Sequence, residues 1–138
     1  MSMPYSSYFE HDADIGIIGR GATVEQAFEA AAQAVFAIVT DLDLVQPSTI
    51  ITIEFEEDDL EFALVTWLNQ LLGNARAQGM VFSCFHMQRN GDKWRAEALG
   101  EKWRAGLERG VEVKGATLTM LSVKQSGPMW EVRCVVDV

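Results

Sequence analysis

The residues best suited to binding chemistry lie near the two ends of this 138-residue sequence. His11, Asp12 and Asp14 place one imidazole and two carboxylates close together near the start. Near the other end Asp137 precedes Val138, whose backbone carboxylate is expected to be a free chain terminus. If folding brings the two ends together, their oxygens form a pocket of the kind that hard divalent cations bind. We therefore expect the rest of the chain to act as the scaffold that unites them.

A run of glycines follows the first of these clusters. Residues 15–21 are apolar and β-branched but are interrupted by Gly16, Gly19 and Gly21, which predicts a strand whose neighbours approach its backbone closely. The spacing lacks the Lys-Ser/Thr of a phosphate-binding loop and does not match the dinucleotide-binding fingerprint. The glycines therefore favour a structural role over nucleotide binding.

Composition limits the classes of function. The chain is 49% hydrophobic and 22% charged, which predicts one domain over residues 1–138 with a full core. Its net charge of -9 disfavours strong direct binding to nucleic acid, because an acidic surface repels phosphates. Neither a secretory signal nor a membrane span is visible, and Cys84 and Cys134 lie in apolar runs that suit buried thiols in a reducing compartment. We therefore expect a soluble, cytoplasmic protein.

The hydrophobic pattern predicts two helices. Thr23 opens a capping sequence before an apolar stripe over residues 24–39. The acidic run at residues 56–59 favours the start of a second helix, because helix dipoles attract negative charge there. The apolar stripe of that helix covers residues 60–72, and Gly79 is a natural left-handed stop.

The remaining apolar segments predict strands, because they are rich in β-branched residues or, from residue 80 onward, have hydrophobic residues that alternate with a period of two. These segments are residues 5–10, 15–21, 49–55, 80–88, 93–100, 111–123 and 129–138. Asn90-Gly91 favours a tight hairpin turn between the fourth and fifth of them. In the last one Asp137 falls on the side opposite the most apolar face. The sequence therefore predicts an α+β fold with two amphipathic helices packed on one face of a mainly antiparallel β-sheet.

Several motifs resemble, in order and spacing, those of the archease family. The stretch from Glu10 to Gly16 is similar to the family's His-Thr-Ala-Asp-Val/Ile-Gly signature, with Asp12 where Thr is usual. Further matches are the segments 25–30, 79–82, 100–102 and 112–117, and an Asp-aliphatic pair closes the chain. The resemblance covers residues 5–138.

The resemblance implies a non-catalytic accessory protein that activates an RtcB-type RNA ligase in tRNA splicing and RNA repair. Such a protein promotes guanylylation of the ligase and its multiple turnover, and is not itself an enzyme. The resemblance also implies a divalent cation held by Asp14, Asp137 and Val138, most often Ca²⁺, with Mg²⁺ or Mn²⁺ as alternatives. Asp12 and His11 are candidates for an extra ligand or a supporting role, and Lys114 matches a lysine that the family uses for activation.

Two other classes of function stay open from the sequence. One is a metal-dependent phosphohydrolase built on the acidic cluster, although no Ser-His-Asp arrangement or nucleotide loop is visible. The other is a chaperone-like regulatory module for a different nucleic-acid-modifying enzyme. Nucleotide turnover by the isolated protein would favour the first. Stimulation of another partner, unaffected by Asp14→Ala, would favour the second.

Overall fold

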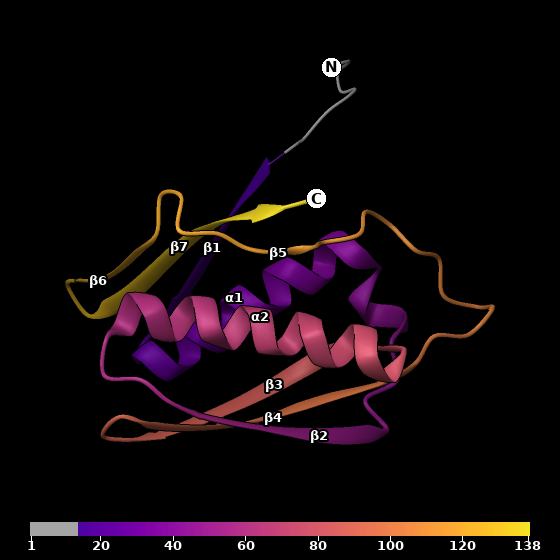
Figure 1. Cartoon of the computed structure of the whole chain (residues 1–138), viewed down its shortest axis with the longest axis horizontal. Helices are drawn as coiled ribbons and strands as arrows, with labels where there is room; N and C mark the ends of the chain where they lie inside the picture. Colours follow the sequence, from indigo (N-terminus) through magenta and orange to yellow (C-terminus); the bar gives the residue numbers. More distant parts are fainter. Residues whose placement is uncertain (1–13) are drawn as a thin grey trace.

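Two helices form a layer between two antiparallel sheets (Figure 1). The structure, a computed structural model, describes residues 14–138. The elements in chain order are β1 (Asp14–Gly21), α1 (Val24–Val39), a short 3-10 helix (Leu42–Leu44), β2 (Thr49–Glu56), α2 (Leu60–Gln78), β3 (Met80–Asn90), β4 (Lys93–Lys102), β5 (Gly115–Ala116), β6 (Ser122–Ser126) and β7 (Met129–Asp137). The strand expected at residues 5–10 lies outside the described residues.

The first sheet is built around β7, the last strand of the chain. β1 pairs with β7 along one edge, from Asp14 opposite Asp137 to Gly21 opposite Trp130. Along the other edge β7 pairs with both β5 and β6, which occupy different parts of its length. The beginning and the end of the described chain therefore lie side by side in one sheet.

The second sheet has the order β2-β4-β3. Its β3–β4 hairpin turns at Gly91, whose φ of 64° lies in the left-handed region that glycine adopts without strain. This confirms the hairpin predicted from Asn90-Gly91.

Both helices begin and end as the sequence predicts. The Thr23 hydroxyl accepts the Gln26 amide at 3.1 Å, and the Gln26 side chain accepts the Ala22 amide at 3.0 Å. Asp59 caps α2 by accepting the amides of the first turn, and Gly79 ends it with a φ of 63°. The two helix starts are therefore fixed by local contacts.

The close approach predicted for the glycine run occurs where β1 lies on α1. A Cβ added at Gly19 would lie 2.4 Å from the Ala27 carbonyl oxygen and 2.6 Å from the Ala31 amide nitrogen. A Cβ at Gly16 would meet nothing within 4 Å. The absence of a side chain at Gly19 therefore lets the strand rest directly on the helix backbone and fixes the position of β1.

The core lies between the two sheets and ties the helices together. The buried Trp67 of α2 donates its indole N–H to the Phe28 carbonyl of α1 at 3.0 Å. The Phe28 ring stacks on Trp94 of β4 with centroids 4.8 Å apart. These contacts make the helix layer a rigid support for both sheets.

Two sequence expectations are corrected. The α+β class, the two helices and the antiparallel strands are confirmed, but the strands form two sheets rather than one, so α1 packs on β1 and on β3. The segment 111–123 is not one strand. It contains the two-residue strand β5 and the first two residues of β6, with a loop between them. Alternation predicts an extended chain with one buried face, but it does not reveal which edge is free to pair with it. No helix within residues 14–138 is long and apolar enough to cross a membrane.

Candidate functional site

The pairing of β1 with β7 brings two predicted site residues together. Asp14 lies directly opposite Asp137 in this antiparallel register, so the two side chains project from the same face of the sheet. Both residues are exposed, and the neighbouring Ile17 and Val136 are buried against the helices. The two carboxylates therefore face outward at one end of the strand pair.

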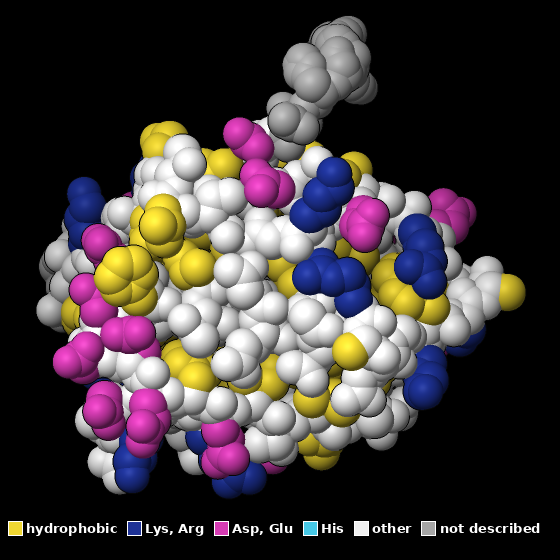
Figure 2. Space-filling model, viewed as in Figure 1, with side chains coloured by type: hydrophobic (Ala, Val, Ile, Leu, Met, Phe, Trp, Pro, Cys, Tyr) yellow, Lys and Arg dark blue, Asp and Glu magenta, His cyan; other side chains and the backbone are white. Residues whose placement is uncertain are grey.

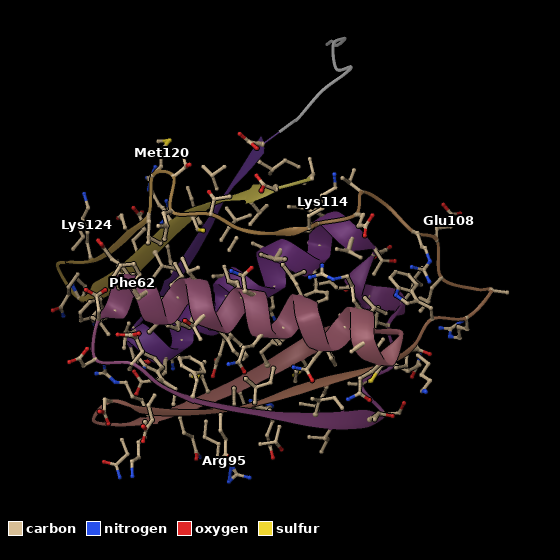
Figure 3. The ribbon with its side chains drawn as sticks, viewed as in Figure 1. Phe62, Arg95, Glu108, Lys114, Met120 and Lys124 are labelled. Atoms are coloured by element: carbon tan, nitrogen blue, oxygen red, sulfur yellow. The ribbon has the colours of Figure 1, made fainter. Side chains whose placement is uncertain are left out.

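Lys114 joins this arrangement from the other side of β7. Its backbone amide donates to the Asp137 carbonyl at 2.8 Å, and the next residue, Gly115, is the register partner of Asp137. Because the backbone groups of Asp137 are engaged toward β5, Asp14 and Asp137 form a pair without direct backbone hydrogen bonds between them. In an antiparallel ladder, pairs of this kind have the closest opposed side chains. The Lys114 side chain is exposed along the same edge (Figure 3).

Two polar residues of α2 hold the segment that carries Lys114. Asn69 accepts the Ala116 amide through its side-chain oxygen at 2.8 Å and donates to the Ala116 carbonyl at 3.4 Å. Arg76, two helical turns later, donates to the Lys114 carbonyl at 3.1 Å. Sequence reasoning missed both residues, because a polar residue on an exposed helix face gives no signal that it binds a distant backbone.

At the opposite end of the same strand pair, charges of opposite sign pair with one another. Arg20 of β1 lies opposite Glu131 of β7 and forms an ion pair of 3.0 Å with it. Arg133 binds the other carboxylate oxygen at 2.9 Å. Hydrogen bonds from Arg133 and then Arg20 hold the pKa of the Glu131 carboxyl below its usual range. The like-charged pair at the Asp14 end therefore contrasts with the balanced charges at the Glu131 end.

The described residues offer a divalent cation only a small set of oxygen donors at this end of the sheet. Asp14 and Asp137 supply two carboxylates, and Val138 follows Asp137 directly and is half-buried. Within residues 14–138 no group of three His, Cys, Asp or Glu side chains is placed to hold a metal ion. A site here thus depends on a backbone oxygen or on residues before Asp14. His11 and Asp12, the candidates for extra ligands, lie outside the described residues.

A cavity of about 420 Å³ lies beside this arrangement, at the C-terminal ends of α1 and α2. Its lining includes Arg76, Trp103 and Arg109, and the Arg109 guanidinium lies 4.0 Å from the centre of the Trp103 ring. Figure 2 shows Lys and Arg side chains on the right of this face and acidic side chains at its lower left. Helix C-termini carry partial negative charge, which these arginines offset. The cavity therefore gives no clear preference for an anionic ligand.

Comparison with known proteins places this geometry in a family. The model of the archease protein family matches residues 7–138. The chain belongs to the archease family. It is 33% identical to the archease of Aeropyrum pernix over 135 residues, which cover 94% of each chain. It is 34% identical to the archease of Sulfolobus acidocaldarius over 134 residues, which cover 95% of this chain and 96% of the relative.

Solved structures of the same fold agree with this assignment. The solution structure of a Methanobacterium thermoautotrophicum protein matches with a TM-score of 0.81 and 30% identity, covering 94% of this chain and 96% of that one. The crystal structure of a Thermotoga maritima archease, described as a possible chaperone, matches with a TM-score of 0.68 and 18% identity, covering 97% and 98% of the two chains. The second likeness shows the fold alone. The archease fold expected from the motifs is thus confirmed.

Proposed function

We propose that this archease is a non-catalytic accessory protein that activates an RtcB-type RNA ligase, with a divalent cation bound at the Asp14–Asp137 end of the first sheet. In this proposal the protein promotes guanylylation of the ligase and its repeated turnover in tRNA splicing and RNA repair. Asp14, Asp137 and Val138 hold the cation, with Ca²⁺ preferred over Mg²⁺ and Mn²⁺. Lys114 acts in activation.

The observation that carries the proposal is the pair of opposed carboxylates with Lys114 beside it. Opposed like charges destabilise a sheet, whereas a cation between them removes the repulsion. Ca²⁺ takes six to eight oxygens, so this small donor set leaves room for water or for oxygens of a partner. An exposed cation with open coordination suits a contact between two proteins. The acidic net charge of -9 also suits association with a basic, RNA-binding enzyme, because opposite potentials speed the encounter.

A ligase assay tests the proposal. Guanylylation of a limiting amount of purified RtcB-type ligase is followed with the wild type and with Asp14→Ala, Asp137→Ala and Lys114→Ala. The wild type should accelerate the reaction, and each variant should lose about tenfold or more of this effect, as is typical when groups that support a metal site are removed. Lys114→Ala keeps the backbone amide that donates to Asp137, so it tests the ammonium group alone.

Lys124→Ala is the matched control, because Lys124 is exposed on β6 in the same sheet and faces the other end of β7 (Figure 3). It should stimulate the ligase as well as the wild type does. Equal stimulation by all four variants would reject the assigned residues. No stimulation by the wild type would reject the accessory role.

A further inference from the structure

The loop between β5 and β6 exposes two large apolar side chains. Leu118 is 63% exposed and Met120 is 73% exposed, the highest fractions among the large hydrophobic residues of the described chain. Figure 3 shows Met120 at the tip of this loop, which projects beyond the sheet. Single exposed apolar residues are common, but two on one projecting tip form a feature that folding does not require.

The backbone at Met120 is also unusual. Its φ of 53° lies in the left-handed region, and Met120 is the one non-glycine residue with positive φ within residues 14–138. A side chain in this conformation costs free energy that glycine would avoid. Backbone strain of this kind occurs in turns and clusters at sites of binding, catalysis and switching. The loop thus holds an apolar side chain in water at a cost to folding.

The base of the loop is fixed by several hydrogen bonds. The Thr117 amide and hydroxyl both donate to the Val135 carbonyl, at 3.0 and 2.9 Å, and the Val135 amide donates to the Thr119 carbonyl at 3.3 Å. The buried Cys134 thiol donates to the Thr117 carbonyl at 3.2 Å. The tip is therefore held in place before any partner binds, which lowers the entropy cost of association.

The loop and the carboxylate pair belong to one continuous edge of the molecule. Val135, which holds the loop, is two residues before Asp137 in β7, a distance of about 7 Å along a strand. Both residues lie on the strand face that points away from the helices. A partner that reaches the cation would therefore also meet Leu118 and Met120.

We propose that Leu118 and Met120 are apolar anchors that insert into a hydrophobic socket on the ligase that this protein activates. This inference rests on the proposed function and adds the surface and the chemistry of the contact. A flexible Met side chain adapts to irregular apolar sockets. The two anchors alone cannot supply the roughly 800 Å² per partner of a standard interface, so the polar edge with Asp14, Asp137 and Lys114 must contribute the rest.

Two other occupants fit the charges less well. A symmetric dimer through this edge would bring the Asp14–Asp137 pairs of two copies toward each other, because the same patch meets itself in such an interface. A membrane surface would carry anionic lipids, which repel a chain with a net charge of -9. A protein with an apolar socket beside a basic surface meets neither objection.

Binding of purified ligase to the full chain tests the inference. The variants are Leu118→Ser, Met120→Gly and their combination, and Met120→Gly removes the side chain while relieving the left-handed backbone. Each single change should weaken binding about tenfold, and the pair about a hundredfold if the effects add. Ile50→Ser is the matched control, because Ile50 is 55% exposed on β2 of the other sheet, and its affinity should equal that of the wild type.

Cation affinity, measured on the same variants, should match the wild type. The urea midpoint should be no lower than that of the wild type, because Met120→Gly relieves the left-handed backbone. Wild-type affinity in both loop variants, while Asp137→Ala still fails to stimulate, would overturn the inference and leave the proposed function standing. No binding of the wild type to the ligase would overturn both. A dimer of the wild type that Met120→Gly dissociates, or sedimentation with phosphatidylserine vesicles that it abolishes, would overturn the inference in favour of those occupants.

Discussion

Replacing Asp137 by Asn should stabilise the protein without a divalent cation and destabilise it with one. The substitution keeps the shape of the side chain and removes one of the two carboxylates that face each other across β1 and β7. Without a cation it removes a repulsion. With a cation it removes a ligand. The reversal of sign is the signature expected of a binding site, because a merely structural residue would change stability in one direction.

The register sets the size of the first effect. Two unit charges about 6 Å apart repel by about 0.7 kcal/mol in water, and like charges opposed across strands cost about 0.2–1 kcal/mol. At low salt we therefore expect Asp137→Asn to raise the free energy of unfolding by about 0.5 kcal/mol. Near 1 M salt the gain should vanish, because charges are then screened beyond about 3 Å.

Ligand linkage sets the size of the second effect. A cation at about 100 times its dissociation constant stabilises the native wild type by about 2.7 kcal/mol, and a variant without the site gains almost nothing. In saturating Ca²⁺ the variant should therefore be less stable than the wild type by about 2 kcal/mol. Urea unfolding followed by tryptophan fluorescence, in EDTA and in Ca²⁺, measures both differences.

Asp43→Asn is the control for the general effect of removing one negative charge. Asp43 is exposed in the connection between α1 and β2, far along the chain from β1 and β7. This variant should gain as much from Ca²⁺ as the wild type. The reasoning is refuted if Asp137→Asn is the less stable protein in EDTA at low salt, or if Ca²⁺ stabilises it as much as the wild type.

Two further predictions concern the scaffold of the site. Gly19→Ala should lower the free energy of unfolding by about 3 kcal/mol, because its Cβ would overlap backbone atoms of α1. Gly16→Ala is the control: a Cβ there has open space, so the variant should be neutral or more stable by under about 1 kcal/mol. Equal urea midpoints of the two variants would contradict the close packing. Burial raises the pKa of the Cys134 thiol in the folded protein above its value in the unfolded chain. The stability that the neutral thiol confers is therefore full below the pKa of the unfolded chain, and it is lost as the pH rises through the pKa of the folded protein. The urea midpoint of the wild type should fall more steeply above about pH 8 than that of Cys134→Ala. A thiol reagent added to the native protein should label Cys84 before Cys134. Equal slopes and equal labelling would count against a buried thiol.

Local sequence signals predicted the parts of the fold that neighbouring residues decide. Thr23 and Gly79 mark the ends of helices because their contacts and backbone angles involve residues within one turn. Asn90-Gly91 predicts its hairpin for the same reason. These features needed no knowledge of the rest of the chain.

Strand pairing was harder to predict, because a strand exists through a partner that is distant in sequence. The segment 111–123 has the alternation of a strand, yet only residues 115–116 and 122–123 of it pair with β7. Between them the chain leaves the sheet and exposes Leu118 and Met120. Period-two alternation therefore indicated an extended chain but did not reveal the projecting loop.

The sequence by itself determined which residue types could form the candidate site: acidic groups at Asp14 and Asp137, and a lysine at position 114. Only the tertiary structure decided that they meet, because a shift of one residue between β1 and β7 would place the two carboxylates on opposite faces of the sheet. It also decided that Asn69 and Arg76 hold the segment with Lys114, a role that depends on backbone atoms nearly forty or more residues away. Contacts of that range follow from packing of the whole core, which no local pattern records.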